Sequence, residues 1–151
     1  MGVDGVRRGR TDGGPILSVE ELRTLLAGAF PGRAGEGGTV EVLGPGTARM
    51  ILDPLPAMAR PGNIVSGPTL MTLADHVAYA VILAHTGPML MAVTHTLTMS
   101  FLRACRFERI VADATILKMG RRLVTVDVRI WQGSEAGIVA QATVGYTLPS
   151  G

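Results

Sequence analysis

The stretch from Arg60 to Asp75 combines a turn-rich loop with the start of an apolar helix that carries one carboxylate. Gly67 stands where this helix is expected to begin, and a helix N-terminus offers free backbone N–H groups that favour a developing negative charge. Asp75 lies two turns further on among apolar neighbours, where a carboxylate is costly unless it has a task. This pair of groups is therefore the main candidate for a site of chemistry.

Gly67 and Asp75 are eight residues apart, which separates them by about 12 Å along one helix. One chain therefore cannot easily present both groups to the same reacting atom. A two-fold dimer can, because an antiparallel helix of the partner brings its carboxylate near the glycine of this chain. The spacing predicts an obligate homodimer with its site at the subunit interface, and a homotetramer is the larger assembly that stays open.

Two helices and six strands are expected to position these groups. Ser18 and Glu21 have the spacing of a capping box, which predicts a short amphipathic helix over about 18–30. The longest helix is expected over about 68–86, and the proline-rich segment 54–67 before it is expected to be a loop. The strands are predicted at about 39–43, 47–52, 91–101, 109–119, 123–131 and 138–148.

An antiparallel sheet of about six strands has to wrap around the long helix to bury it, so the sequence predicts an α+β fold. The length of 151 residues suits one domain, expected over 16–151 after a flexible tail at 1–15. Gly87-Pro88 interrupts the uncharged stretch 77–102, so neither part is long enough to cross a membrane. The chain is therefore expected to be soluble, with no membrane partner.

The composition limits the classes of function. A net charge of +2 gives little support to a nucleic-acid partner. Cys105 is the single cysteine, which excludes an intrachain disulfide and fits a packed side chain in a reducing, cytoplasmic compartment.

The three histidines lack the spacing of a zinc site, so no metal is expected. His95 falls on the apolar face of its strand and is expected to be a core residue. His85, near the helix end, suits the helix dipole, and His76 is expected to be a packing or surface residue.

Four segments resemble the hotdog-fold acyl-CoA thioesterases of the phenylacetate-pathway type, and the resemblance covers about 38–148. The segments are Gly67 with Leu73-Ala74-Asp75, the run from Thr94 to Arg103, Lys118-Met-Gly-Arg-Arg-Leu123, and Ile138-Val-Ala-Gln-Ala-Thr143. The resemblance implies a hotdog fold, a homodimer, an acyl-CoA thioester as substrate, and no cofactor. It leaves aryl, short-chain and medium-chain acyl groups open.

The resemblance also implies roles for individual residues. The backbone N–H of Gly67 would polarise the thioester carbonyl, Asp75 would be the nucleophile or general base, and Thr94 would orient the attacking water. Arg and Lys are the usual partners of phosphate groups, so basic residues at strand ends and in one turn are candidates for coenzyme A binding. The expected substrate-binding residues are Arg60, Asn63, Ser66, Arg103, Lys118, Arg121 and Arg122, with Arg106 close to the same basic set.

The chain departs from the family pattern at three positions: Arg60 replaces an Asn, Ser66 replaces a His and Pro68 replaces a second Gly. Pro68 suits a first helical position. Arg60 and Ser66 leave open a catalytically silent acyl-CoA-binding protein. A hotdog dehydratase is a further alternative, in which His95 would have to supply the required histidine, and a purely structural oligomer is the last.

Overall fold

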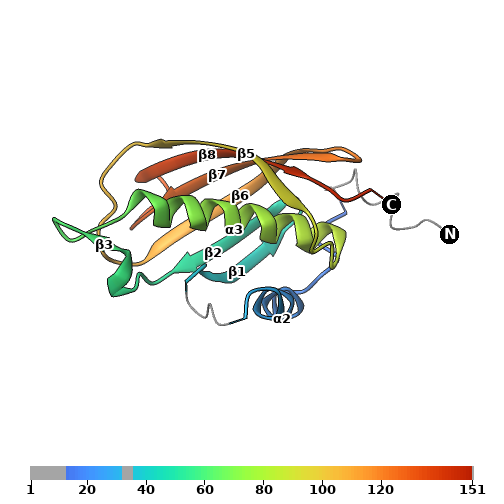
Figure 1. Cartoon of the computed structure of the whole chain (residues 1–151), viewed down its shortest axis with the longest axis horizontal. Helices are drawn as coiled ribbons and strands as arrows, with labels where there is room; N and C mark the ends of the chain where they lie inside the picture. The colour runs from blue at the N-terminus through green and yellow to red at the C-terminus, as the bar shows by residue number, and fades with distance from the viewer. Residues whose placement is uncertain (1–12, 32–35, 151) are drawn as a thin grey trace.

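The computed structural model describes residues 13–31 and 36–150, in which an antiparallel sheet curls around the helix α3 (Gly67–Thr86) (Figure 1). The sheet order is β1-β2-β6-β7-β8-β5, and each neighbouring pair is antiparallel. The strands are β1 (Thr39–Gly44), β2 (Thr47–Leu52), β5 (Val93–Phe101), β6 (Ile110–Met119), β7 (Leu123–Trp131) and β8 (Ile138–Thr147). The predicted α+β hotdog architecture is confirmed, while most of the predicted tail at 1–15 lies outside the described residues.

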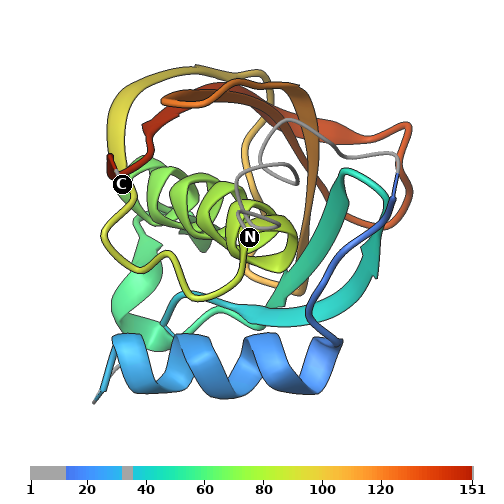
Figure 2. The same ribbon diagram turned by 90° about the vertical axis from the view of Figure 1, so that its right-hand side faces the viewer.

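The helix α3 forms the centre of the core. Every residue from Val77 to His85 is buried, and the end-on view shows the sheet curving around this helix (Figure 2). By length and composition alone α3 could cross a membrane, but it is mostly buried inside the structure. A helix that is apolar on all sides is expected in such a core position.

The helix α2 (Val19–Ala29) closes the side of α3 that the sheet leaves open (Figure 2). It begins with the predicted capping box: the Glu21 backbone N–H donates to Ser18 Oγ at 3.1 Å, and the Ser18 N–H donates to Glu21 Oε1 at 2.9 Å. Leu22 is fully buried in the core. The preceding Ile16 N–H donates to the Ala84 carbonyl at 2.7 Å, which ties the start of this segment to the end of α3.

His85 connects α3 to the β1–β2 hairpin and is buried, with 1% of its surface exposed. Its Nε2 accepts the Gly46 backbone N–H at 2.9 Å, and its Nδ1 lies 2.8 Å from the Val81 carbonyl. Because one nitrogen faces a donor and the other an acceptor, the ring is the neutral tautomer with its proton on Nδ1. His85 lies in the last turn of α3, as predicted, and it anchors the hairpin there through hydrogen bonds.

The segment 54–67 is not the plain loop that was predicted. It contains a short 3-10 turn (Pro56–Met58) and a hairpin of β3 (Ala59–Arg60) and β4 (Ile64–Val65). Gly62 and Asn63 both have positive φ, 95° and 57°, and this left-handed geometry reverses the chain within a few residues. The prolines flank the paired residues, so they do not interrupt the hairpin.

The alternation of β5 is broken by a bulge. Thr94 and Thr96 pair with consecutive residues of β8, so His95 is the additional residue. After the bulge Leu97 and Met99 pack against the core, whereas His95 is exposed. The prediction of a core histidine is therefore wrong, because the extra residue shifts the period of the strand.

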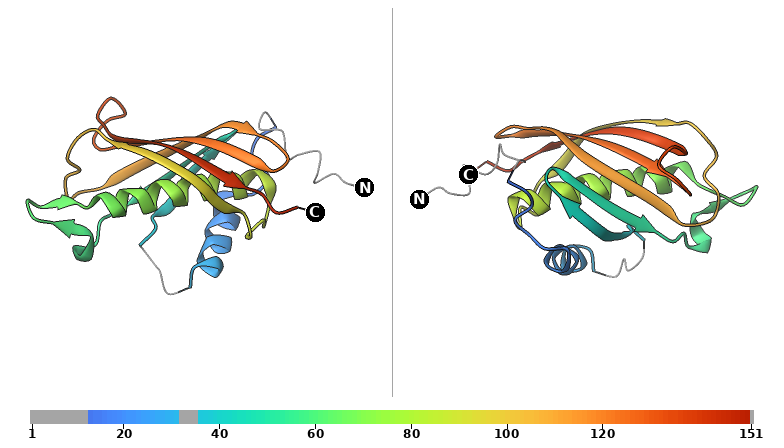
Figure 3. Two further views of the ribbon diagram at one scale, coloured as in Figure 1. Left: turned by 45° about the horizontal axis from the view of Figure 1, so that its top comes forward. Right: turned by 180° about the vertical axis from the view of Figure 1, so that it is seen from behind.

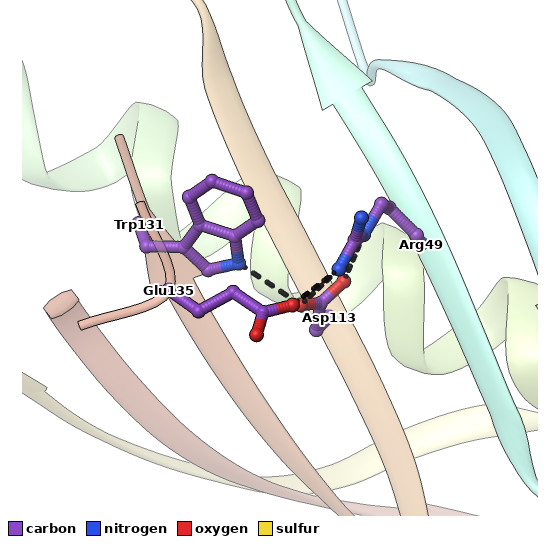
Figure 4. A network of polar contacts seen from close by, with 4 residues as sticks. All are labelled: Arg49, Asp113, Trp131 and Glu135. Carbon is purple, nitrogen blue, oxygen red and sulfur yellow. Dashed lines mark hydrogen bonds and ion pairs between the residues drawn. The ribbon is translucent and has the colours of Figure 1, made fainter. Parts of the chain in front are cut away.

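No helix among the described residues covers the outer face of the sheet (Figure 3). Arg49 pairs with both oxygens of Asp113 at 2.7 and 3.0 Å, and it reaches Glu135 in the β7–β8 turn at 2.9 Å (Figure 4). Trp131 Nε1 donates to Asp113 at 2.9 Å, and its ring lies 5.2 Å from the guanidinium carbon. This network joins three strands and one turn.

Replacement of His85 by leucine is expected to destabilise the fold by about 1–3 kcal/mol, because the buried Gly46 N–H loses its acceptor while the side-chain volume is largely kept. Thr86→Val is the matched control, since the Thr86 hydroxyl donates to a carbonyl of its own helix. Thr86→Val should lower the free energy of unfolding by less than about 1 kcal/mol. Chemical denaturation measures both, and equal losses would contradict an anchoring role for His85.

Candidate active site

Asp75 lies at the point on α3 where the buried part of the helix gives way to its partly exposed first turns. Two hydroxyl groups donate to the same carboxylate oxygen, Oδ1: Thr94 Oγ1 at 2.6 Å and Tyr146 Oη at 2.8 Å. The Tyr146 hydroxyl also lies 3.2 Å from the backbone carbonyl of Asp75. Hydrogen bonds of this kind stabilise a carboxylate outside bulk water.

A cleft of about 530 Å³ opens beside this carboxylate. Tyr79 and Tyr146 stack with their ring centres 5.9 Å apart, and Phe30, the residue directly after α2, meets Tyr79 edge-on at 5.8 Å. Burial raises the pKa of both tyrosines, so their hydroxyls stay protonated donors. The cleft is lined by Phe30, Thr72, Asp75, His76, Tyr79, Leu90, Ala92, Val93, Thr94 and Tyr146.

Gly67 is the first residue of α3, and Ser66 is its N-cap, whose Oγ accepts the Thr69 N–H at 3.3 Å. Within the described part of the chain the Gly67 N–H has no hydrogen-bond acceptor. A Cβ at this position would lie 3.6 Å from the Phe101 ring, at the end of β5. The amide is therefore available to an anion or a polarised carbonyl from outside the chain.

Gly67 and Asp75 lie on one continuous helix, as predicted, and the structure does not bring them together within the chain. Arg60 and Asn63 lie in the β3–β4 hairpin beyond the N-terminal end of α3, on the Gly67 side (Figure 1). Ser66 stays beside Gly67 as the helix cap. The predicted loop residues therefore gather at one end of α3, away from the carboxylate.

The predicted basic set divides into two groups at opposite ends of β5. Arg121 and Arg122 occupy the β6–β7 turn, where the Arg122 carbonyl accepts the Leu148 N–H just beyond the end of β8 that pairs with the start of β5. Lys118 is exposed near the same turn. Arg103 follows the other end of β5, where its N–H donates to the Val139 carbonyl at 3.2 Å.

Tyr146 is the site residue that sequence reasoning missed. The alternation in 138–148 puts Tyr146 on the same strand face as Ala142 and Val144, and this face is the buried one, where Tyr146 is 3% exposed. A tyrosine on an otherwise aliphatic inner face needs a partner for its hydroxyl, and that signal could have pointed to a buried acceptor. That the acceptor is Asp75 could not be predicted, because the two residues are 71 positions apart in the sequence.

No group of three or more His, Cys, Asp or Glu side chains in residues 13–31 and 36–150 could hold a metal ion. Cys105 is buried and unpaired with another cysteine, and burial raises the pKa of its thiol to about 11. It is a packed side chain, as predicted, and not an activated nucleophile.

The central helix of this hotdog fold therefore carries a carboxylate that two hydroxyls hold beside a cleft. Residues 62–139 match the family model of the thioesterase superfamily. A proposed thioesterase from Silicibacter species TM1040 is 31% identical, with a TM-score of 0.82, over 90% of this chain and 94% of that one. This chain therefore belongs to the thioesterase superfamily and is a thioester hydrolase.

Two further solved structures share the fold. A proposed thioesterase from Ralstonia eutropha JMP134, described as related to phenylacetic acid degradation, is 25% identical over 83% of this chain and 97% of that one, with a TM-score of 0.73. A hypothetical thioesterase from Streptococcus pneumoniae TIGR4, solved with coenzyme A, is 19% identical over 88% and 98% of the two chains, with a TM-score of 0.69. No curated protein matches the sequence. The resemblance seen in the sequence motifs is confirmed.

Gly67→Ala is expected to leave the free energy of unfolding within about 0.5 kcal/mol of the original, because the new Cβ makes an ordinary contact with Phe101. Gly38→Ala is the comparison: its φ is 88° and its Cβ would lie 3.1 Å from the Ile51 carbonyl, so a loss of about 1–3 kcal/mol is expected. Thermal or chemical denaturation measures both. Equal destabilisation would mean that the fold itself needs glycine at position 67.

Proposed function

We propose that this thioesterase hydrolyses an acyl- or aryl-coenzyme A thioester to the free acid and coenzyme A, with Asp75 as general base or nucleophile. The observation that carries the proposal is the Asp75 carboxylate, held through one oxygen by two hydroxyls at the wall of a 530 Å³ cleft. The coenzyme A bound to the Streptococcus structure supports this class of substrate. No further cofactor is needed for hydrolysis.

Either of two routes fits a carboxylate in this position. As a base, Asp75 takes a proton from water while the oxygen adds to the carbonyl carbon, and collapse of the tetrahedral intermediate expels the coenzyme A thiolate. As a nucleophile, it forms an acyl anhydride with loss of the thiolate, and water then cleaves the anhydride. In both routes the carbonyl oxygen becomes negative, and the Gly67 N–H is suited to stabilise it.

A second copy of the chain is required to bring these groups together. The strand β5 is an edge of the sheet and carries no charged residue and no proline from Val93 to Phe101. Exposed apolar side chains flank it, with Met91 at 75% and Leu102 at 58%. An uncharged, unprotected edge is a template for pairing with another strand, so we infer a homodimer with antiparallel β5 strands.

Such a pairing about the middle of β5 completes the site. Within one chain Asp75 is bonded to Thr94 at the start of β5, whereas Gly67 lies against Phe101 at its end. Antiparallel pairing lays the start of one β5 against the end of the other. It therefore brings Gly67 of the partner subunit toward Asp75, and each dimer would have two sites.

The same operation would unite the two basic groups. Arg103 of the partner subunit would approach the edge that carries Arg121 and Arg122, with Lys118 close by, and the combined group suits the phosphates of coenzyme A. The loop residues Arg60, Asn63 and Ser66 would then come from the subunit that supplies the amide. We place the protein in the cytoplasm, where a buried free thiol and a coenzyme A substrate are both at home.

The alternatives differ in what supports them. The outward position of His95, on the opposite face of β5 from the cleft, argues against the dehydratase alternative, which relied on that histidine. His76 does line the cleft, but its Nδ1 lies 3.2 Å from the Gly37 carbonyl and its ring packs on Phe30. A silent acyl-CoA-binding protein rests on Arg60 and Ser66 alone. Ser66 has a structural role as the helix cap, which explains a serine at that position without reference to catalysis.

Asp75→Asn is expected to lower the rate of thiol release from acyl-coenzyme A by at least about 100-fold, because the amide can neither accept a proton from water nor attack the carbonyl. A panel of aryl, short-chain and medium-chain thioesters, followed with a thiol reagent, gives the rate and the acyl preference. Thermal unfolding and light scattering establish that the variant keeps its fold and assembly.

Binding of acyl-coenzyme A by the unaltered protein without thiol release would replace hydrolysis by the silent binding function. Equal turnover by the unaltered protein and Asp75→Asn would keep the enzyme but remove this carboxylate from its mechanism. Loss of turnover in the variant alone supports the proposal.

Thr98→Arg is expected to dissociate the dimer and abolish turnover, because a two-fold pairing brings the two new charges together near the middle of β5. Thr115→Arg is the matched control: it places the same charge at an exposed position on β6, a strand that lies between β2 and β7 and not at the edge of the sheet. Light scattering and thiol release are measured on both. A dimer that persists with Thr98→Arg would argue for a different interface.

A further inference from the structure

Thr94 and Tyr146 are directly opposite each other in the ladder between β5 and β8. Both side chains lie on the inward face of the sheet, and both hydroxyls donate to Oδ1 of Asp75, at 2.6 and 2.8 Å. Within the described part of the chain, Oδ2 of the same carboxylate has no hydrogen-bond partner. The carboxylate is therefore held asymmetrically, with one oxygen fixed and the other left free beside the cleft.

Tyr146 is held more rigidly than an exposed hydroxyl would be. Its side chain is 3% exposed, its ring stacks on Tyr79, and its hydroxyl reaches both Oδ1 and the backbone carbonyl of Asp75. Thr94, in contrast, is exposed on the edge strand. Tyr146 therefore fixes the direction of the carboxylate from its more deeply buried side.

We propose that Tyr146 is a positioning residue for the thioesterase reaction: with Thr94 it fixes Oδ1 of Asp75, and it thereby makes Oδ2 the oxygen that accepts the proton of water or attacks the thioester. The inference rests on the proposed function of Asp75. Its physical basis is that a reacting group confined to one orientation avoids the entropic and reorganisation cost of finding that orientation in each turnover.

The stereochemical consequence is specific. The single hydroxyl proton of Thr94 is donated to Oδ1, so this hydroxyl can interact with an attacking water only as an acceptor. The water would then lie between Thr94 Oγ1 and the free Oδ2. The Tyr146 hydroxyl is directed at Asp75, so its loss should affect the chemical step more than the binding of the thioester.

Tyr146→Phe tests this assignment because it keeps the ring and removes only the hydroxyl. We expect kcat for acyl-coenzyme A hydrolysis to fall by about 10- to 100-fold, while KM and the dissociation constant of free coenzyme A change by less than about threefold. Trp131→Phe is the comparison, since it removes an aromatic N–H that donates to a different carboxylate, Asp113, at 2.9 Å on the outer face of the sheet and away from the cleft. Its kcat should exceed that of Tyr146→Phe by at least about tenfold.

Incorporation of p-aminophenylalanine at position 146 provides the rescue. This side chain keeps the ring and an N–H donor, so kcat should recover over that of the phenylalanine variant. Both variants share any packing change at the tyrosine stack, and the difference between them isolates the donor. Thermal unfolding of both identifies a folding defect.

A kcat for Tyr146→Phe equal to that of the unaltered protein overturns the positioning role. Equal kcat values for the phenylalanine and p-aminophenylalanine variants, both below that of the unaltered protein, also overturn it, since packing alone would then explain the loss. Failure of the proposed function is distinct, because the unaltered protein would then release no thiol or Asp75→Asn would retain full turnover.

Discussion

The burial of α3 is the constraint on which the rest of the structure depends. From Val77 to His85 every residue of this helix is buried, so the helix is stable only where other elements surround it. The curved sheet provides most of that cover and α2 closes the remaining side. The exposed residues of α3 are confined to its first turns, and this is where both Gly67 and Asp75 lie. The site therefore lies where the sheet and α2 no longer bury α3 completely.

The carboxylate of Asp75 sits at this boundary, where partial burial makes an ionised group expensive. Two hydroxyls that face each other across neighbouring strands offset that expense, and hydrogen bonds to a charged acceptor are among the stronger ones in proteins. The pairing register of β5 with β8 therefore does more than hold the sheet together. It also sets which atoms meet the carboxylate.

Much of this fold can be read from the sequence because its signals are local. Examples are the capping box of Ser18 and Glu21, the long apolar helix and the strict alternation of β7. Each of these patterns is formed by residues that are close together in the sequence. The candidate residues Gly67 and Asp75 can also be identified from the sequence, because one marks the start of a helix and the other is a carboxylate within an apolar helix.

The features that sequence reasoning missed depend on distant contacts. The bulge at His95 does not disturb the alternation of apolar and polar residues in the sequence of β5. Only the pairing of β5 with β8 reveals the extra residue. The hydrogen bond from Gly46 to His85 and that from Tyr146 to Asp75 join residues 39 and 71 positions apart. A period in the sequence predicts which face a side chain occupies, but it does not predict the atom that this side chain meets.

Gly145 gives the bulge a further consequence. A Cβ there would lie 2.7 Å from Thr96 Cγ2 and 2.8 Å from His95 Nε2, so the outer face has no room for even a methyl group at this position. Gly145 directly precedes Tyr146, and the Thr96 that it pairs with is two residues from Thr94. A missing side chain on the solvent side of the sheet thus keeps the two strands close enough for both hydroxyls to reach one oxygen on the other side. The geometry of the carboxylate is consequently sensitive to a substitution on the opposite face of the sheet.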